Sequence, residues 1–209
     1  MRVLDLFCGA GGSAMGLHRA WPDAEIVGID IKKQPRYPFT FIWGDALEYL
    51  TSFDRTYPYD FFWASPPCQR FSCVTPVGKR ENHPDLIERV QYSLIGIGKP
   101  FVIENVFGAR HKLRNWKMLC GTMFGLDCRR HRVFEANFPW TLPDRQCDHS
   151  FPPLLVTTAG ANSRKIGNYK SVKNAIRAYG IDWMDGNGLK EAIPPAYSEY
   201  IARQWSASR

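Results

Sequence analysis

The sequence predicts an α/β fold in which helices cover both faces of a mostly parallel sheet. Two observations support this prediction. Short apolar runs of strand length alternate with segments of helical period through the first half of the chain. A glycine-rich turn joins the first predicted strand to the first predicted helix. In such sheets ligands lie beyond the carboxyl ends of the strands, so we expect the loops after the strands to converge on one crevice.

The predicted strands are short apolar runs, and most of them run into glycine, serine or acidic residues. They lie at residues 2–7, 25–30, 39–43, 60–64 and 101–103. The predicted helices carry apolar side chains three or four residues apart, as at Leu86, Val90 and Leu94. They lie at residues 12–20, 86–97, 171–179 and 196–205, with a further helix opened by Asp45.

The pattern becomes irregular from residue 135, where prolines interrupt it and Ser, Asn and Gly are common. We therefore divide the chain into a main core at 1–134, a small irregular recognition segment at 135–175, and a return to the core at 176–209. The sequence contains no internal repeat and no low-complexity tract.

The composition favours a polyanionic partner and excludes a membrane protein. The net charge is +7 and the pI is near 9.2, and each phosphate that a basic residue neutralises releases counterions. Basic residues are clustered at 110–117, 129–132 and 164–177, although any one of them is equally well explained as solvated surface charge. No apolar run reaches the roughly 18 residues of a membrane span. The amino terminus lacks the pattern of a secretory signal, so we expect a soluble, cytoplasmic, bacterial or phage-like protein with reduced cysteines.

The first candidate site element is the glycine-rich turn at residues 9–12, which follows a strand and opens a helix. Glycines in this position let the backbone approach a nucleotide-like ligand closely. Asp30 ends the next strand and is placed to accept hydrogen bonds from ribose hydroxyls. Alone, this element is also compatible with NAD or with a purely structural turn.

The second element is the loop at residues 65–72, directly after the fourth strand. Pro66 and Pro67 restrict the backbone and hold Cys68 in a fixed position. A cysteine is a strong nucleophile at neutral pH, and nearby cations make it stronger. An isolated cysteine is more often an inert buried side chain, but the prolines and the strand end favour a nucleophile.

The third element is Glu104, which closes the fifth strand in the same expected crevice. A carboxyl group can donate or accept a proton beside a bound base if burial raises its pKa. Without Cys68, a helix cap or a surface carboxylate would be the simpler interpretation.

Together these stretches resemble the cytosine-5 DNA methyltransferase family. Five short motifs occur in the family's order: residues 5–12 resemble its cofactor motif, 44–47 its adenine-contacting turn, Pro67-Cys68-Gln69 its catalytic loop, Glu104-Asn105-Val106 its acid motif, and Arg130-His131-Arg132 its paired arginines. The resemblance implies a Rossmann-like S-adenosylmethionine-dependent methyltransferase fold over residues 1–134. It also implies DNA as the partner, as a duplex with a flipped cytosine, without an obligatory protein partner.

The resemblance further implies the chemistry. The thiolate of Cys68 adds to C6 of cytosine while Glu104 hydrogen-bonds N3. C5 then takes the methyl group of S-adenosylmethionine, which leaves S-adenosylhomocysteine, and loss of the C5 proton expels the cysteine. Arg130 and Arg132 would contact the base and its surroundings, with a structural salt bridge left open for one of them. Their positive charge favours the thiolate.

Several further residues are assigned by the same resemblance. The expected cofactor-binding residues are Phe7, Gly9, Gly11, Asp30, Ile31, Asp45, Ala46, Pro66 and Ala192. The expected substrate-binding residues are Gln69, Ser72, Asn105, Arg164, Lys165 and Lys170.

The aromatic residues Trp43, Phe61, Phe62 and Trp63 lie in strand-like runs and are expected in the core.

The chain departs from the family pattern in three places. Cys128 stands where the family usually has Gln, two residues before the first arginine of the pair. The family's Gly-Asn pair near the carboxyl end corresponds to Lys190-Glu191, ahead of Pro194-Pro195. The recognition segment is also much shorter than usual, so we expect a short target sequence or little sequence preference.

No metal site is expected. Cys120, Cys128, Cys147 and His149 are a conceivable zinc set, but they lack the close Cys-x-x-Cys pairs of common structural sites.

Three other functions remain open. The same thiol and acid would serve methylation of cytosine in RNA. A catalytically inactive DNA-binding relative would need neither group, and an NAD-dependent oxidoreductase would leave the Pro-Pro-Cys-Gln loop without a role.

Overall fold

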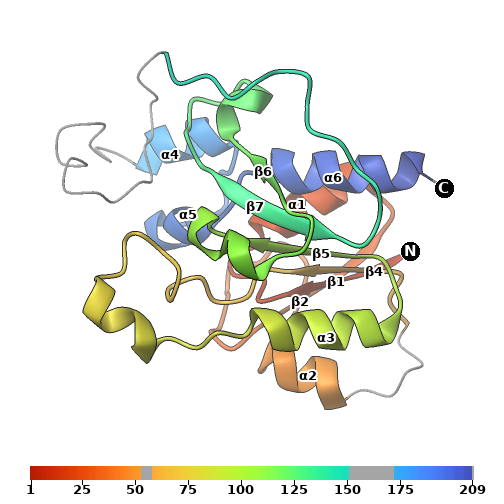
Figure 1. The fold of residues 1–209 in the computed structure, drawn as a ribbon. Coiled ribbons are helices and arrows are strands. Elements are labelled where there is room, and N and C mark those ends of the chain that lie inside the picture. The colour runs from red at the N-terminus through yellow and green to blue at the C-terminus, as the bar shows by residue number, and fades with distance from the viewer. Residues whose placement is uncertain (53–57, 151–171, 209) are drawn as a thin grey trace.

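The computed structural model describes residues 1–52, 58–150 and 172–208. A seven-stranded sheet lies at its centre, in the order β3-β2-β1-β4-β5-β7-β6 (Figure 1). The strands are β1 Arg2–Leu6, β2 Glu25–Asp30, β3 Thr40–Trp43, β4 Phe61–Ala64, β5 Phe101–Asn105, β6 Lys117–Leu119 and β7 Arg132–Ala136. The first five are parallel to one another, and β7 is antiparallel to both β5 and β6.

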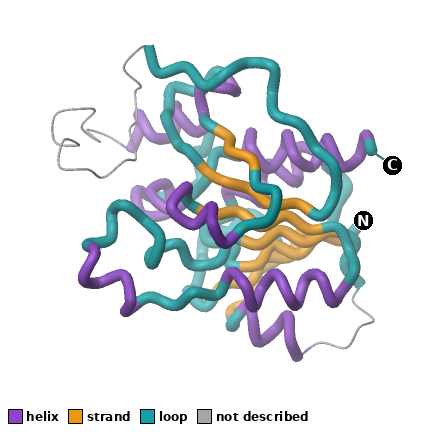
Figure 2. Tube along the Cα trace, in the orientation of Figure 1, coloured by secondary structure: helices purple, strands orange, loops and turns teal. Residues whose placement is uncertain are grey.

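Helices cover both faces of this sheet (Figure 2). The α-helices are α1 Gly12–Ala20, α2 Ala46–Ser52, α3 Ile87–Ile97, α4 Val172–Tyr179, α5 Gly186–Glu191 and α6 Pro195–Ala207. Three short 3-10 helices, η1 Val77–Asn82, η2 Phe107–Lys112 and η3 Gly121–Phe124, lie between strands. In the part of the chain that is described, no helix combines the length and the apolarity that crossing a membrane requires.

The alternation of side chains along β4 divides the core in two. Phe61 and Trp63 pack with α1 and α6 on one face, whereas Phe62 and Ala64 pack with α2 and α3 on the other. Both faces of β4 are apolar because a central parallel strand is covered on both sides. The expectation that Phe61, Phe62 and Trp63 belong to the core is confirmed, since all three are fully buried.

Trp43 does not follow that expectation. Its side chain is 63% exposed, because β3 is the edge strand of the sheet and Trp43 is its last residue. The prediction of a core position for Trp43 was therefore wrong.

The predicted helices and the strands of the parallel sheet are all present, with ends within two residues of those expected. The antiparallel strands β6 and β7 and the short helix α5 were not predicted. β7 extends to Ala136, past the boundary drawn at residue 134. Most of the expected recognition segment, residues 151–171, lies outside the described residues.

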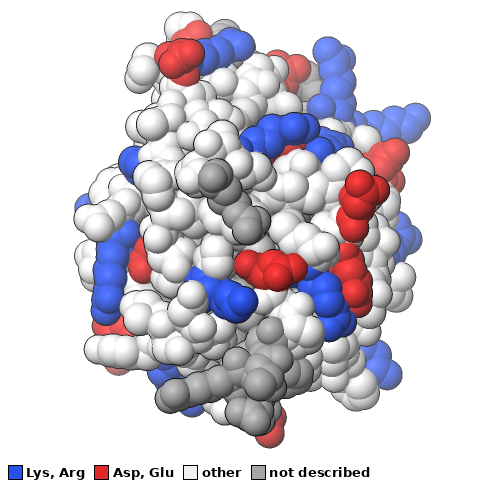
Figure 3. All heavy atoms as spheres, turned by 90° about the vertical axis from the view of Figure 1, so that its right-hand side faces the viewer, with Lys and Arg blue, Asp and Glu red and all other residues white. Residues whose placement is uncertain are grey.

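The carboxyl ends of the parallel strands lie on the left of Figure 1, opposite the chain's amino terminus. The space-filling view of the other side, toward the amino ends, shows acidic and basic side chains interspersed (Figure 3). Among the residues described on that face the charges are therefore mixed, which is a poor match for a polyanion.

Candidate active site

The loop after β1 brings three residues with left-handed backbone to the carboxyl edge of the sheet. Phe7 has φ 57°, Gly9 has φ 48° and Gly11 has φ 86°. Phe7 carries a side chain in this conformation, which costs on the order of 1–3 kcal/mol and is typical of ligand sites. A β-carbon on Gly11 would lie 2.7 Å from Cδ of Pro38, whereas one on Gly9 would meet no atom within 4 Å. Gly9 therefore leaves open space beside the loop, and Gly11 allows close packing below it.

Asp30 connects this loop to β2. Its Oδ2 accepts a hydrogen bond from the Gly9 amide at 2.9 Å, and its Oδ1 accepts one from the Lys32 amide at 2.8 Å. A carboxylate has about four lone-pair positions, so Asp30 keeps capacity for a hydroxyl of a ligand. The next residue, Ile31, is 66% exposed.

Two other expected cofactor residues have structural roles at the start of α2. Oδ1 of Asp45 accepts hydrogen bonds from the amides of Leu47 at 2.8 Å and Glu48 at 3.0 Å, which caps the helix. The Ala46 side chain is buried in the core. Ala46 can therefore offer a ligand its backbone but not its side chain.

The carboxyl-terminal part of the chain covers the glycine turn. Trp183 Nε1 donates to the carbonyl of Ala10 at 2.9 Å. A β-carbon on Gly12 would lie 3.3 Å from that of Ala192, so Ala192 does lie against the turn. Trp183 was not predicted for this site, because nothing in its local sequence points to a contact that spans 173 residues.

The Pro-Pro-Cys loop leaves β4 beside the end of β5. The Ser65 amide donates to the carbonyl of Leu6 at 3.0 Å, and the Phe71 amide donates to the carbonyl of Cys68 at 3.0 Å. A β-carbon on Gly108 would lie 2.1 Å from the carbonyl oxygen of Phe71. The loop is thus held at both ends by backbone contacts, with Cys68 half-buried between them.

Asn105, an expected substrate-binding residue, makes two hydrogen bonds within the protein. It is 1% exposed; its Nδ2 donates to the carbonyl of Pro66 at 3.0 Å, and its Oδ1 accepts from the Val106 amide at 2.9 Å. Both ends of the amide are therefore engaged within the protein. Asn105 positions the Pro66-Pro67-Cys68 loop through these bonds, and its expected role in substrate binding remains a prediction.

Glu104 and Arg132 form a buried ion pair, with Arg132 Nε donating to Oε1 of Glu104 at 2.9 Å. Burial raises the pKa of Glu104, although Arg132, Arg130 and the Ser65 hydroxyl each act to lower it. The removal of water outweighs the cations, because a carboxylate without solvation is costly. Glu104 is thereby shifted toward the protonated form that can donate to a base.

The thiol of Cys68 experiences the same competition. Burial raises the pKa of Cys68, and the negative charge of Glu104 raises it further, while Arg132 and Arg130 lower it. As expected, the charges of the two arginines lower the pKa of Cys68 and so favour the thiolate. Their effect is nevertheless smaller than that of burial, so the free protein favours the protonated thiol.

Arg130 lies 2% exposed, and its hydrogen bonds point into the protein. Its NH1 donates to the Tyr179 hydroxyl at 3.2 Å, and its NH2 donates to the carbonyls of Lys190 at 2.8 Å and Glu191 at 2.9 Å. This arrangement does not support the expected contact with a base. It ties β7 to α4 and to the residues just before Ala192.

Of the remaining expected substrate-binding residues, the structure describes two and leaves three outside the described ranges. Gln69 and Ser72 are half-buried in the Cys68 loop; the Ser72 hydroxyl accepts from the Val74 amide at 3.2 Å. Arg164, Lys165 and Lys170 lie outside the described residues and remain predictions.

Exposed side chains near the end of β5 include Phe107 and Trp116, with the Arg110 guanidinium 4.4 Å above the Phe107 ring.

Asp5 was not predicted as an important residue, yet it lies fully buried in β1 beneath the glycine turn. Its carboxyl oxygens accept from the Ser13 hydroxyl at 3.1 and 3.2 Å and from the Tyr37 hydroxyl at 3.2 Å. Burial raises its pKa to about 7 despite these hydrogen bonds. Asp5 connects the first turn of α1 to the segment that packs under Gly11.

Three of the four residues considered and rejected as a zinc set do come together. Cys120, Cys147 and His149 form one cluster, and the fourth member is His131 rather than Cys128. Cys128 is buried separately, against α4 and α5. The expectation of no metal site rested on sequence spacing alone, and the fold brings these distant side chains together.

Comparison with known proteins identifies related sequences and folds. The sequence profile of the C-5 cytosine-specific DNA methylase family matches residues 1–123. The solved structure of the Entamoeba histolytica methyltransferase EhMeth is similar over 100% of this chain and 99% of its own, with 11% identity and a TM-score of 0.64. This likeness confirms the expected methyltransferase fold.

Less extensive similarity is found to two other solved structures. An antibiotic-related methyltransferase has 11% identity and a TM-score of 0.38, over 65% of this chain and 86% of its own. The plantazolicin methyltransferase BpumL in complex with S-adenosylhomocysteine has 18% identity and a TM-score of 0.33, over 51% of this chain and 39% of its own. No curated protein sequence matches the chain.

Proposed function

Because the chain belongs to the C-5 cytosine-specific DNA methylase family, we propose that it methylates carbon 5 of cytosine in DNA with Cys68 as the nucleophile. The chain is a methyltransferase, and its methyl donor is S-adenosylmethionine. The observation that carries the proposal is the buried pair of Glu104 and Arg132 at the end of β5, whose charges act on the Cys68 thiol at the end of β4. The glycine turn after β1 opens at the same edge of the sheet.

The residues at the glycine turn fit the cofactor. Open space beside Gly9 and the remaining acceptor capacity of Asp30 suit the methionine and ribose parts of S-adenosylmethionine. Ile31 and Trp43 are exposed and joined by a hydrogen bond from Trp43 Nε1 to the Ile31 carbonyl at 2.9 Å, which suits packing against an adenine ring. When bound there, S-adenosylmethionine supplies an electrophilic methyl group to C5 of the target base.

Cys68 must lose its proton to react, since the thiolate is the nucleophile. In the free protein burial is the main factor that keeps the thiol protonated, and Glu104 adds to it whenever it is ionised. The carboxylate that Glu104 becomes after donating its proton to the base raises the pKa of Cys68, so we assign loss of the Cys68 proton, to solvent water, to the bound complex while Glu104 is still protonated. The protein would thus keep an unreactive thiol until substrate is present.

Glu104 supplies the acid in this scheme. Hydrogen bonding or proton donation from Glu104 to N3 withdraws electrons from the ring while the sulfur of Cys68 bonds to C6. C5 thereby becomes an enamine-like carbon that can accept the methyl group. Solvent water then takes the C5 proton and the N3 proton returns to Glu104, so that the electron pair of the C5–H bond restores the ring and expels the Cys68 thiolate.

The two arginines have different roles in the proposal. Arg132 stabilises the ionised form of Glu104 after proton donation and counters the unfavourable effect of burial on the Cys68 thiolate. Arg130 is a positioning residue, because its guanidinium is occupied by Tyr179 and by backbone carbonyls. It holds the segment that lies against the glycine turn.

A base stacked in a duplex cannot reach a half-buried cysteine, so the target cytosine must be flipped out or already unpaired. RNA is the second candidate substrate, because the same thiol and acid would act on an unpaired cytosine. A relative that binds DNA without catalysis is disfavoured by the retention of both Cys68 and Glu104.

Trapping with 5-fluorocytosine tests the proposal, because fluorine at C5 cannot leave as a proton. Duplex DNA and transfer RNA carrying 5-fluorocytosine are each incubated with the protein and S-adenosylmethionine. The expected result is a denaturant-resistant complex with DNA in the wild type and none in Cys68→Ser. A complex with RNA alone would replace DNA by RNA, and methyl transfer to cytosine without any trapped complex would contradict the covalent mechanism.

A further inference from the structure

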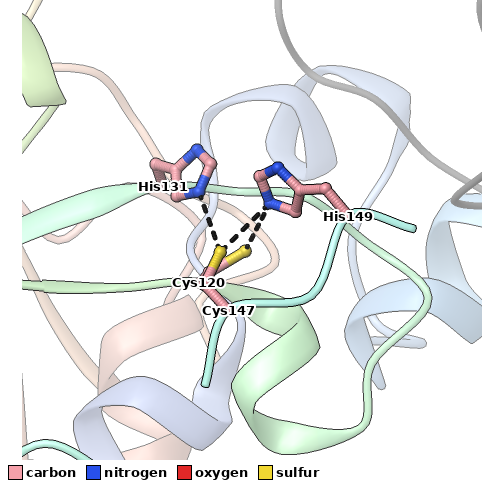
Figure 4. Close-up of side chains that lie close together, drawn as sticks. All are labelled: Cys120, His131, Cys147 and His149. Carbon is pink, nitrogen blue, oxygen red and sulfur yellow. Dashed lines mark hydrogen bonds between the residues drawn. The ribbon is translucent and has the colours of Figure 1, made fainter. Parts of the chain in front are cut away.

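Four side chains that bind metals well converge at the edge of the sheet farthest from β3. They come from three places in the chain: Cys120 precedes η3, His131 precedes β7, and Cys147 and His149 follow β7. One ligand atom from each lies within 4.8 Å of the corresponding atoms of the other three. Figure 4 shows both imidazole rings pointing toward the two sulfur atoms.

The distances match those of a tetrahedral metal site. His149 Nε2 lies 3.1 Å from Sγ of Cys147 and 3.6 Å from Sγ of Cys120, and His131 Nε2 lies 3.4 Å from Sγ of Cys147. With Zn–S of about 2.3 Å and Zn–N of about 2.0 Å, a tetrahedral angle places the sulfur and nitrogen atoms about 3.5 Å apart. These three sulfur–nitrogen separations are therefore close to the S···N distance of a tetrahedral zinc site, and all four ligand atoms lie within 4.8 Å of one another.

Neighbouring groups hold the ligands in this arrangement. The Thr122 hydroxyl donates to Sγ of Cys120 at 3.3 Å and accepts from the Asp148 amide at 3.1 Å. Arg129 NH2 donates to the carbonyl of His149 at 2.7 Å. Supporting hydrogen bonds of this kind orient metal ligands and strengthen binding.

We propose that Cys120, His131, Cys147 and His149 bind one Zn²⁺ ion and form a structural zinc site. Two thiolates and two neutral imidazoles are a donor set that zinc prefers. Four protein ligands complete the tetrahedron, so the ion has no open position for water or substrate. The two thiolate charges balance the charge of the ion, which leaves the site neutral.

Two other uses of these side chains explain less of the arrangement. A disulfide between Cys120 and Cys147 would use both sulfurs and leave two converging imidazoles without a role. A thiol activated by a histidine would need one residue of each kind and would leave the other pair unexplained. Zinc accounts for all four side chains.

The site would connect two regions of the proposed enzyme. His131 lies between Arg130 and Arg132, whose side chains hold the carboxyl-terminal segment and Glu104. Cys147 and His149 lie at the end of the extended segment that leaves β7 and crosses the top of Figure 1. The ion would therefore fix that segment to the strand that carries the catalytic arginine, at the point where the chain enters residues 151–171.

Metal binding by the purified full-length chain tests the proposal. The protein is titrated with Zn²⁺ alone against a chromophoric chelator, and separately with Co²⁺ under reducing, anaerobic conditions. We expect one ion per chain. Bound Co²⁺ should give the intense visible bands of a tetrahedral site together with a sulfur-to-cobalt charge-transfer band.

The variants Cys147→Ser and His149→Ala should each weaken zinc binding by at least about tenfold. Cys73→Ser, which removes an exposed cysteine outside the cluster, should bind as the wild type does. Loss of the charge-transfer intensity in Cys147→Ser, but not in Cys73→Ser, would identify the sulfur ligand. If a variant fails to fold, the cobalt spectrum of the wild type still shows whether the protein holds a tetrahedral metal ion with sulfur ligands.

Three results would overturn the proposal. The first is that the folded wild type binds neither zinc nor cobalt stoichiometrically. The second is that both ligand variants bind zinc with the affinity of the wild type. The third is that the native protein has a mass two hydrogens below that of the reduced chain, because Cys120 and Cys147 form a disulfide. None of these measurements depends on methyl transfer, so a failure here would leave the proposed function untouched.

Discussion

Arg132 donates a hydrogen bond from Nε to Oε1 of Glu104 at 2.9 Å, and the side chains are only 14% and 9% exposed. Breaking a buried pair of this kind leaves a charge without a partner and commonly costs about 3–5 kcal/mol. Here the carboxyl group can avoid that cost by taking up a proton. The pair is thus suited to exchange a proton with a base beside it.

Replacement of Cys68 by serine should abolish methyl transfer while leaving the affinity for S-adenosylmethionine nearly unchanged. A serine hydroxyl is a much weaker nucleophile than a thiolate, and Cys68 lies on the loop after β4 rather than on the glycine turn. Transfer of labelled methyl groups measures the first effect and calorimetry with S-adenosylhomocysteine measures the second. Substantial residual methylation would exclude the assigned nucleophile.

Replacement of Glu104 by glutamine should lower kcat by about a hundredfold or more, because general acid support is commonly worth that much. Glutamine retains the shape of the side chain and can still accept from Arg132, so the fold should be preserved. Single-turnover rates under saturating DNA and cofactor isolate the chemical step. Equal rates in the variant and the wild type would remove Glu104 from the mechanism.

Arg132→Gln should make Cys68 harder to ionise, because the arginine lowers the pKa of the thiol. The alkylation rate of Cys68 by iodoacetamide, followed by mass spectrometry of its peptide between pH 7 and 10, reports the thiolate fraction directly. The rate should rise with pH in both proteins, and the midpoint should lie at higher pH in the variant. The alkylation rate of Cys73 in the same sample serves as the internal control. An unchanged midpoint for Cys68 in the variant would contradict an effect of Arg132 on the ionisation of the thiol.

Gly9→Ala and Gly11→Ala should affect the protein differently. Both place a side chain at positive φ, which costs about 1–2 kcal/mol, but only the alanine at Gly11 also collides with Pro38. Urea unfolding should therefore show the greater loss of stability for Gly11→Ala. Calorimetry should show weaker S-adenosylmethionine binding for Gly9→Ala than for the control Gly78→Ala, whose new side chain meets no atom within 4 Å and needs no positive φ.

Asp5 should make the folded state less stable as the pH rises. Its pKa is about 7 in the folded protein against 3.8 for the unperturbed group, so between these values the folded state keeps a proton that the unfolded state has lost. Its contribution to stability is fully present below pH 3.8 and is lost as the pH rises toward 7.

A shift of this size corresponds to on the order of 4 kcal/mol. Urea unfolding at pH 5 and pH 8 should show a smaller decrease in stability for Asp5→Asn than for the wild type. Asp23→Asn, at an exposed carboxylate, should retain the full decrease. Parallel decreases in all three proteins would show that another group dominates.

The parallel half of the fold could be predicted because its strands are apolar on both faces and its glycines mark the turns. β7 was not predicted, because Glu135, the fourth of its five residues, is charged and interrupts the apolar run. This carboxylate is buried because it accepts hydrogen bonds from Gln91 Nε2 at 2.6 Å and from the Arg114 amide at 2.8 Å. Neither partner can be identified from local sequence.

The candidate site shows the same division. The positions of Cys68 and Glu104 at the carboxyl edge of the sheet could be predicted, since each lies at or just after the end of a recognisable strand. The difference between Arg130 and Arg132 could not, because it depends on Tyr179 and on carbonyls some 60 residues away. His131 was read only as the middle of an arginine motif, and its proximity to Cys147 follows from the path of the chain after β7.

The hydrogen bond from Trp183 to Ala10 and that from Ser198 to the carbonyl of Ser13 join residues separated by 173 and 185 positions. Protein synthesis makes the glycine turn before the residues that cover it. A nascent chain therefore has the glycine turn long before it has Trp183, which contacts the turn, and helix α6, which packs against α1. Affinity for the methyl donor should therefore appear only after α6 has left the ribosome.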